Sequence, residues 1–332
     1  MTRPRILVTN WVHEATLQQL SLLGDVDVNE TRSPWPRDEV MRRAEKADAI
    51  LAFMTDCIDA PFLARCRRLR VVACALKGYD NFDLEACTAS GVWISIVPDL
   101  LTEPTAELAV GLAIGLARNI RDGDALVRAG AFEGWRPVLY GTGLDGSIVS
   151  IVGMGRVGRA VAQRLSGFGC RILGIDPAAQ MPAGVTKEDL DTALATSDFI
   201  IVCAPLTPGS HHQIGEDALA RIKPGALLIN IGRGSVVDES AVAAALETGA
   251  LGGYAADVFE MEDWAHPDRP KAIDQRLRTH PRTLFTPHLG SAVTRVRQAI
   301  EMRAVANIAD VLEGRPPRDA INAPEKSLAS AG

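Results

Sequence analysis

The chain has 332 residues, which favours two domains over one, because single hydrophobic cores stop growing at roughly 250–300 residues. Hydrophobic residues make up 47% of the chain and charged residues 23%, a balance that excludes disordered and fibrous proteins. The net charge is −6, so the chain has no overall positive charge to attract nucleic acids or anionic membranes. We expect neither as a partner.

No run of 18 apolar residues is present, and the first residues lead directly into the strand-like segment ILVT. We therefore expect neither a membrane span nor a signal peptide, and a cytoplasmic location. The six cysteines form no CxxC pair, and His211 and His212 lack acidic or cysteine neighbours. This pattern predicts reduced thiols and no metal site.

In the first hundred residues, short runs rich in Val and Ile alternate with amphipathic stretches, which is typical of a parallel sheet with helices. The expected strands are 5–9, 26–29, 49–52, 71–74 and 93–96, and the helices between them include 14–22 and 37–47. A long helix at 102–118, with Pro104 in its first turn, should connect this unit to the next.

A second alternating series follows, with expected strands at 147–152, 171–175, 199–203, 226–230, 253–257 and 283–286. Six such strands suit a doubly wound dinucleotide-binding sheet. A last helix at 292–313 should return to the first unit. The tail, 315–332, is rich in Pro, Ala and Ser, and we expect it to be loosely held.

A glycine motif, Gly153-Met-Gly155-Arg-Val-Gly158, lies between the strand SIVSIV and an expected helix. The first glycine permits a tight turn, the second lets the backbone approach a pyrophosphate, and the third allows close packing of helix and strand. The helix N-terminus adds partial positive charge. The motif in this context predicts a dinucleotide site.

Asp176 ends the second strand of this series, about 20 residues beyond the glycines, where a carboxylate can bind the adenosine ribose. It would repel a 2′-phosphate, and no Arg or Lys follows immediately, so we expect NAD rather than NADP. The triplet Cys203-Ala204-Pro205 closes the next strand and should border the cofactor crevice, although a plain strand terminator explains it equally well.

Three polar residues follow the ends of consecutive strands: Arg233, Glu262 and His288. An arginine offers a planar cationic fork for an oxyanion, and a histidine can exchange a proton near neutral pH. A neighbouring carboxylate would orient the imidazole and raise its basicity. Together they predict an anion-binding site with an acid/base pair.

The segments INIGRGSVVDESAV, GGYAADVFEMED and FTPHLGSAV resemble those of the D-isomer-specific 2-hydroxyacid dehydrogenases. The resemblance implies that Arg233 binds substrate, that His288 is the acid/base and that Glu262 is its partner. It implies an α/β fold in which a Rossmann cofactor domain, 100–291, is inserted into a flavodoxin-like substrate domain, 1–99 and 292–332. Further cofactor contacts are expected from Arg156, Val157, Thr105, Ile231 and Asp257.

Within that superfamily, the segments ALKGYDNFDLEACTASGVW, VPDLLTEPTAEL, LYGTGLDG and DVFEMEDWAHPDRP resemble phosphonate (phosphite) dehydrogenases. Phosphite carries about two negative charges, which Lys77 and Arg233 could neutralise together. The resemblance implies oxidation of phosphite with NAD, in which His288 deprotonates the attacking water. Other substrate-binding candidates are Gly78, Met54, Tyr140, Trp135 and Arg297.

Two alternatives remain open at this point. One is a 2-hydroxyacid dehydrogenase or a glyoxylate or hydroxypyruvate reductase that uses the same three residues on a carboxylate substrate. The other is an NAD-sensing binding protein, which should carry added interaction segments. The apolar faces of 108–117 and its flanks, together with the family resemblance, also suggest a homodimer.

Overall fold

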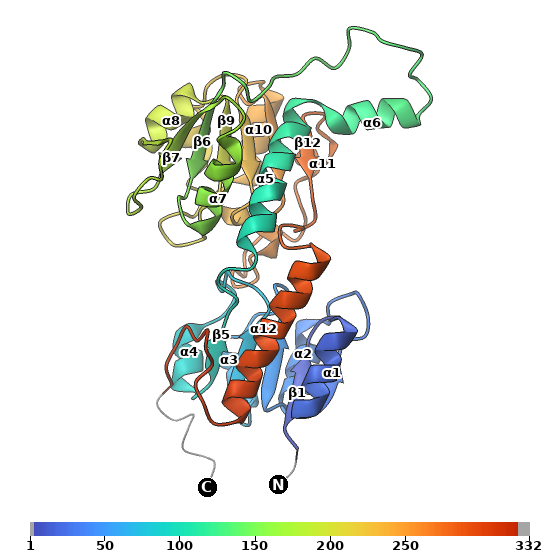
Figure 1. Cartoon of the computed structure of the whole chain (residues 1–332), viewed down its shortest axis with the longest axis vertical. Coiled ribbons are helices and arrows are strands. Elements are labelled where there is room, and N and C mark those ends of the chain that lie inside the picture. The colour runs from blue at the N-terminus through green and yellow to red at the C-terminus, as the bar shows by residue number, and fades with distance from the viewer. Residues whose placement is uncertain (1–2, 325–332) are drawn as a thin grey trace. The chain divides into compact units, whose positions relative to one another are not determined.

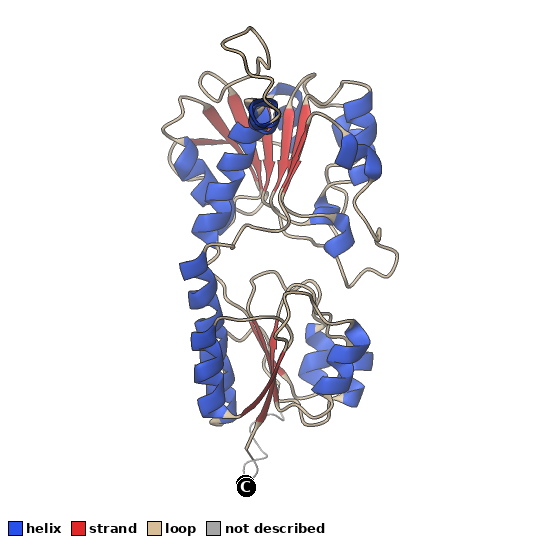
Figure 2. Cartoon of the chain, turned by 90° about the vertical axis from the view of Figure 1, so that its right-hand side faces the viewer, coloured by secondary structure: helices blue, strands red, loops and turns tan. Residues whose placement is uncertain are grey.

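The computed structural model describes residues 3–324, which form two compact units (Figure 1). The first consists of the described residues within Met1–Leu101, Trp264–Pro267 and Val293–Gly332. The second consists of Thr102–Asp263 and Asp268–Ala292. Each unit is a parallel sheet with helices on both faces (Figure 2), so the predicted fold class is confirmed.

The first unit has a five-stranded sheet in the order β2-β1-β3-β4-β5, which is the flavodoxin-like order. All residues of β3 and β4 are buried, because helices cover both faces of the central strands. The strands are β1 Arg5–Val8, β2 Asp25–Val28, β3 Ala49–Ala52, β4 Val71–Cys74 and β5 Trp93–Ser95. The helices are α1 Glu14–Leu23, α2 Arg37–Ala44, α3 Ala60–Arg65, α4 Leu84–Ala89 and α12 Thr294–Leu312.

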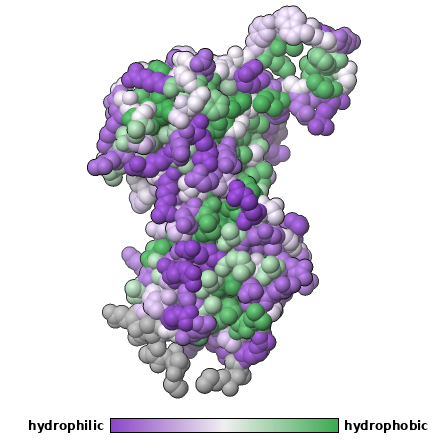
Figure 3. All heavy atoms as spheres, viewed as in Figure 1, coloured by the Kyte–Doolittle hydropathy of each residue, from purple (hydrophilic) through white to green (hydrophobic). Residues whose placement is uncertain are grey.

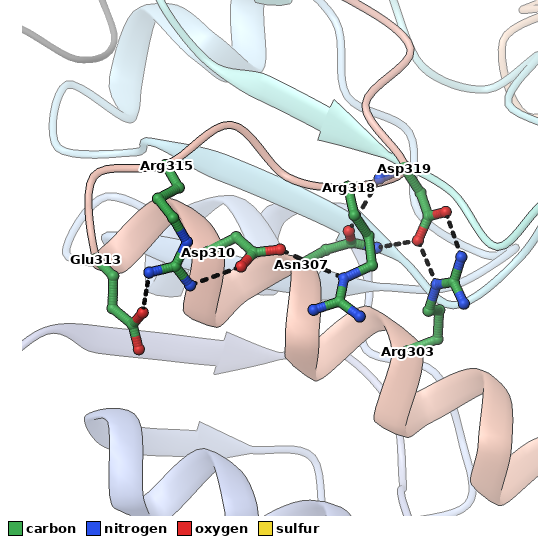
Figure 4. A network of polar contacts seen from close by, with 7 residues as sticks. All are labelled: Arg303, Asn307, Asp310, Glu313, Arg315, Arg318 and Asp319. Atoms are coloured by element: carbon green, nitrogen blue, oxygen red, sulfur yellow. Dashed lines mark hydrogen bonds and ion pairs between the residues drawn. The ribbon is translucent and has the colours of Figure 1, made fainter.

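The last helix, α12, returns to the first unit as predicted and buries Ile300, Ala304 and Ile308 against the sheet. The segment after it was expected to be loosely held, and for its described part this was wrong. Asp319 accepts hydrogen bonds from Arg303 and Asn307 of α12 (Figure 4). Backbone bonds from Ile96 to Asp319 and from Ile321 to Ile94 then attach the tail to the edge of β5. Residues 325–332 of that expectation lie outside the described residues.

The second unit has a seven-stranded sheet in the order β12-β11-β10-β9-β6-β7-β8. Its strands are β6 Ile148–Val152, β7 Arg171–Ile175, β8 Val185–Lys187, β9 Phe199–Val202, β10 Leu227–Asn230, β11 Gly253–Ala256 and β12 Thr283–Phe285. Its helices are α5 Thr102–Ala117, α6 Ile120–Arg128, α7 Arg156–Leu165, α8 Leu190–Thr196, α9 Glu216–Leu219, α10 Glu239–Glu247 and α11 Gln275–Thr279. Two short 3-10 turns are η1 Gly234–Val236 and η2 Glu260–Glu262.

The direction of strand succession reverses between β6 and β9, and this is the topological switch point where doubly wound sheets bind ligands. Six of the seven strands match the predicted ones closely. The edge strand β8 was not predicted, because its three residues, VTK, contain only one large apolar side chain.

The helix predicted to connect the units, α5, lies within the second unit. Its apolar face packs against the sheet and α7, with Ala106, Ala109 and Ala113 fully buried. The apolar residues that suggested a dimer surface at 108–117 are therefore largely used inside the chain. Within residues 3–324, no helix combines the length and apolar character that a membrane crossing requires.

Candidate active site

The glycine loop joins β6 to α7 at the switch point. Gly153 has a φ of +94°, and a Cβ there would lie 2.8 Å from the Ala204 backbone at the end of β9. A Cβ on Gly158 would lie 2.1 Å from the carbonyl oxygen of Gly153. A Cβ on Gly155 would meet no heavy atom within 4 Å, which leaves open space beside the N-terminus of α7. The loop thus fits a cofactor pyrophosphate.

Asp176 follows β7 and faces this loop. Its carboxylate accepts hydrogen bonds from the backbone of Met154, at 3.0 Å, and from Ala178 and Ala179. Burial raises the pKa of Asp176, but these donors and Lys187 outweigh it and hold the pKa below its usual range. A permanent negative charge beside the loop suits a ribose hydroxyl pair and disfavours a 2′-phosphate.

Other predicted cofactor residues lie at the same sheet edge. Arg156 and Val157 begin α7, and Ile231 is buried directly after β10. Burial raises the pKa of the Cys203 thiol to about 12, so this cysteine stays protonated and is no nucleophile. Thr105, near the start of α5, lies beside Gly290, where a Cβ would be 3.1 Å from its Oγ1.

His288 and Glu262, which we predict to be an acid/base pair, lie within hydrogen-bonding distance of each other. His288 follows β12, and its Nδ1 lies 2.5 Å from Oε2 of Glu262, which ends η2. The other oxygen of Glu262 accepts a hydrogen bond from the Phe259 backbone at 2.9 Å, so the carboxylate is held from both sides. With Nδ1 bound to a carboxylate, Nε2 is the nitrogen available to exchange a proton with a substrate.

The turn that carries His288 is held by Asp257, which follows β11. The Asp257 carboxylate accepts hydrogen bonds from the Thr286 hydroxyl and from the backbone of Leu289 and Gly290, at 2.6 to 2.8 Å. These bonds fix His288 in a left-handed conformation, with a φ of +56°, which is uncommon outside glycine. Burial raises the pKa of Asp257 despite these donors. Asp257 was predicted as a cofactor contact, and the structure adds that it positions the histidine turn.

Arg233 follows β10 and immediately precedes η1. Its backbone carbonyl accepts a hydrogen bond from Asn230, and its Nη1 donates to the Gly232 carbonyl at 2.9 Å. Since β10, β11 and β12 are neighbours in the sheet, Arg233, Glu262 and His288 follow the carboxyl ends of three adjacent parallel strands. The structure therefore places all three at one edge of the second unit.

A second group of predicted substrate residues shares an edge of the first unit. Met54 follows β3, and Lys77 and Gly78 follow the neighbouring strand β4. Arg297 of α12 donates a hydrogen bond from Nη1 to the Ala75 carbonyl at 3.2 Å, and its guanidinium lies 5.8 Å from the centre of the Phe53 ring. Burial lowers the pKa of Arg297. These residues thus gather at the carboxyl edge of the five-stranded sheet.

Trp135 and Tyr140 are placed elsewhere, and the expectation that they line the pocket is wrong for the single chain. They lie on the loop between α6 and β6, which extends away from the sheet (Figure 1), and they are 82% and 75% exposed. The Asn119 side chain donates hydrogen bonds to the Leu139 and Tyr140 carbonyls. It also accepts a hydrogen bond from Arg282, which precedes β12. The loop is therefore anchored at the amino end of the strands, opposite His288.

A family model of the D-isomer specific 2-hydroxyacid dehydrogenases, NAD binding domain, matches residues 110–290. The chain belongs to the D-isomer specific 2-hydroxyacid dehydrogenase family. Its second unit is accordingly an NAD-binding Rossmann domain, and the enzyme class predicted from the sequence, an NAD-dependent oxidoreductase, is confirmed at this level.

Curated relatives match over nearly the whole chain. A glyoxylate reductase of Thermofilum pendens is 35% identical over 331 residues, covering 97% of this chain and 95% of the relative. One of Thermococcus litoralis is 32% identical, covering 96% and 97%. The TT0316 protein of Thermus thermophilus has a similar structure, with a TM-score of 0.87, 34% identity and coverage of 96% and 99%.

The names of these curated relatives favour reduction of glyoxylate, the alternative left open by the sequence, over oxidation of phosphite. They carry no support for phosphite as a substrate. A glyoxylate/hydroxypyruvate reductase of Sinorhizobium meliloti, solved with NADP and malonate, also has this fold, with a TM-score of 0.84, 27% identity and coverage of 98% of each chain.

Proposed function

We propose that this dehydrogenase oxidises phosphite to phosphate, with a second candidate reaction, reduction of glyoxylate or a related 2-keto acid. Both reactions use the pair of His288 and Glu262 and the cation of Arg233. They differ in the charge of the substrate, because phosphite carries about two negative charges and a 2-keto acid carboxylate carries one.

The observation that carries the phosphite proposal is Lys77. It follows β4 at the same sheet edge as Met54 and Arg297. In the proposed reaction, its cation binds the second charge of phosphite, in addition to the charge bound by Arg233. Four segments of the chain also resemble phosphonate dehydrogenases. The second candidate has its own support, since the curated relatives at 32–35% identity are named glyoxylate reductases.

In the proposed reaction, Arg233 and Lys77 bind the phosphite oxygens. His288, held by Glu262, takes a proton from a water molecule through Nε2 as the water oxygen bonds to phosphorus. The phosphorus–hydrogen bond breaks, and its electron pair leaves with the hydrogen as hydride. NAD⁺, which the glycine loop and Asp176 would hold, would supply the acceptor for this hydride. The products are phosphate, NADH and the proton on His288, so atoms and charge balance.

With a 2-keto acid, the same residues act in the reverse protonation state. Arg233 binds the carboxylate, and protonated His288 donates its Nε2 proton to the carbonyl oxygen. NADH held at the glycine loop would supply the hydride for the carbonyl carbon. Lys77 has no second charge to neutralise in that reaction.

A direct comparison of substrates tests the proposal. NADH formation from phosphite and NADH consumption with glyoxylate are measured on one preparation at equal cofactor concentration, and kcat/KM is compared. We expect phosphite to be the better substrate. Faster turnover of glyoxylate would assign the second candidate, and an NAD-bound protein inert toward both would revive the NAD-sensing alternative.

We further propose that two copies pair through the arm formed by α6 and the loop that follows it. No residue of α6 is buried, and hydrophobic side chains lie exposed along this arm (Figure 3). The exposed large hydrophobic residues of the arm are Ile120, Val127, Phe132, Trp135, Val138, Leu139 and Tyr140. Sedimentation velocity should give the mass of a dimer, and Val127→Asp should shift it toward one copy. A monomer before the substitution would refute this.

A further inference from the structure

Two short turns of the second unit carry functional residues. Arg233 precedes η1, and Glu262, the partner of His288, ends η2. The two turns are separated by α10 and β11 in the sequence, so each could be placed independently of the other. The structure instead joins η2 to η1, and to the helix α10 that follows η1, at three points in all.

The first point is a backbone contact without intervening side chains. A Cβ on Gly234 would lie 2.0 Å from the carbonyl carbon of Phe259 and 2.2 Å from the nitrogen of Glu260. Any side chain at position 234 would therefore separate the turns. The Arg233 turn lies directly against the start of the Glu262 turn.

The second point is a reciprocal pair of hydrogen bonds between Glu239 and Glu260. The backbone N–H of Glu239 donates to Oε1 of Glu260, and the backbone N–H of Glu260 donates to Oε1 of Glu239, each at 2.8 Å. Both residues are buried, with exposed fractions of 4% and 8%. Glu239 begins α10, so this pair attaches η2 to the helix that follows η1.

The third point is the contact between Ser235 and Asp263. Oδ2 of Asp263 accepts hydrogen bonds from the Ser235 backbone N–H, at 3.0 Å, and from the Ser235 hydroxyl. Ser235 is two residues beyond Arg233, and Asp263 directly follows Glu262. Both are buried, with exposed fractions of 4% and 2%. We refer to the Glu239–Glu260 and Ser235–Asp263 contacts together as the η1–η2 latch.

The latch is costly in electrostatic terms. It brings Glu239 close to Glu260, Glu262 and Asp263, and burial together with these acids raises the pKa of Glu239 to about 7. A well-packed apolar pair would join α10 to η2 without this cost. Carboxylates add directed hydrogen bonds to the backbone of the turns, which fix orientation as well as distance.

We propose that Glu239 and Asp263 are positioning residues, which hold the Arg233 and Glu262 turns as one body through the η1–η2 latch. They keep Arg233, the cation that binds the substrate, and Glu262, the partner of His288, in a fixed relation. Neither Glu239 nor Asp263 touches the substrate itself. The inference rests on the proposed roles of Arg233, Glu262 and His288. It goes beyond them by assigning functions to two buried acids.

The test compares Glu239→Ala, which removes the side-chain bond to η2, with Glu239→Gln, which keeps an acceptor of the same shape. Asp189→Ala is the matched control, because the Asp189 side chain likewise caps a helix of the second unit, α8, by accepting a hydrogen bond from the Thr192 backbone. NADH binding, followed by fluorescence, and thermal unfolding report whether each variant folds.

Two readouts separate positioning from a merely structural role. One is the kcat/KM of whichever substrate the enzyme turns over. The other is the ¹H NMR signal of the His288 Nδ1 proton, which should lie downfield because of its short bond to Glu262 and should be absent in His288→Asn. The NMR signal requires no substrate, so it tests the latch even if both proposed reactions fail.

For Glu239→Ala we expect kcat/KM to fall about 10- to 100-fold, since small displacements of reacting groups have effects of this size. The His288 signal should shift or broaden, and Glu239→Gln should restore both. Asp189→Ala should lower the unfolding temperature but leave the His288 signal in place. If Glu239→Ala folds and binds NADH with an unchanged signal and unchanged kcat/KM, the proposal is wrong. If Glu239→Ala does not fold, Asp263→Ala, which removes the acceptor of the two Ser235 bonds, is measured in the same way and decides with the same outcomes. Asp263→Asn, which keeps an acceptor of the same shape, is then the variant that should restore both readouts.

Discussion

The two parallel sheets of this enzyme carry functional residues at their carboxyl edges in different ways. In the seven-stranded unit, His288, Glu262 and Asp257 are linked by short hydrogen bonds that fix the acid/base pair. In the five-stranded unit, Lys77 and Met54 follow adjacent strands on loops, and Arg297 reaches the same edge from α12. We infer that the first edge performs the chemistry shared by the family and that the second selects the substrate.

The largest effect should come from His288→Asn, at the edge that performs the chemistry. General acid/base catalysis contributes about 10²- to 10⁴-fold, so kcat should fall by that factor with either substrate. NADH binding should be unchanged, since the glycine loop is not altered. Steady-state kinetics and fluorescence titration measure both, and a decrease in kcat below roughly tenfold would remove His288 from the mechanism.

The next effect should come from Lys77→Ala, at the edge that selects the substrate. Loss of a charged hydrogen bond costs about 1.5–3 kcal/mol, so kcat/KM for phosphite should fall about 10- to 100-fold, mainly through KM. Turnover of glyoxylate should change much less. Lys46→Ala, at a lysine of the same unit that lies away from this edge, serves as the control. Equal losses with both substrates would contradict the division of roles.

A smaller effect should come from Asp176→Ala in the seven-stranded unit. Removal of the carboxylate beside the glycine loop ends its repulsion of a 2′-phosphate, so the ratio of kcat/KM for NAD to that for NADP should fall about tenfold. Initial rates with each cofactor measure this ratio. A ratio that stays constant would mean that Asp176 only supports the loop through its bond to Met154.

The smallest effect should come from Asp56→Asn in the five-stranded unit. Burial raises the pKa of Asp56 to about 6, despite hydrogen bonds from Thr9 and Phe53. Since the folded state holds this proton more tightly than the unfolded chain, stability is lost as pH rises from about 4 to about 6. The asparagine variant lacks this loss. Its unfolding temperature relative to the unaltered protein should therefore rise over that window and then stay level.

The sequence predicted most of both sheets, because buried parallel strands are runs of Val, Ile and Leu and the glycine motif marks the switch point. It also predicted that Arg233, Glu262 and His288 lie at one sheet edge, since residues after consecutive parallel strands reach one edge; their catalytic roles stay a prediction. Periodicity could not reveal the short edge strand β8 or the pairing of Ile321 with β5, which depends on where α12 ends.

Other features depend on long-range contacts that no local pattern encodes. Trp135 and Tyr140 were expected at the substrate pocket, but the Asn119 side chain anchors their loop at the other end of the strands. Glu239 looks like an ordinary acid in the first turn of a helix. Only the fold shows that it is buried against Glu260. The one sign of this contact in the sequence is the group of acids at 260, 262 and 263, which does not say what the acids contact.

We propose that hydride moves from phosphorus to the nicotinamide of NAD, and an isotope-transfer experiment follows the hydrogen itself. Phosphite with deuterium on phosphorus is incubated with the enzyme and NAD, and the reduced cofactor is analysed by mass spectrometry. We expect NADH that carries the deuterium, formed more slowly than from unlabelled phosphite. Absence of NADH from phosphite, together with NADH consumption by glyoxylate, would contradict it.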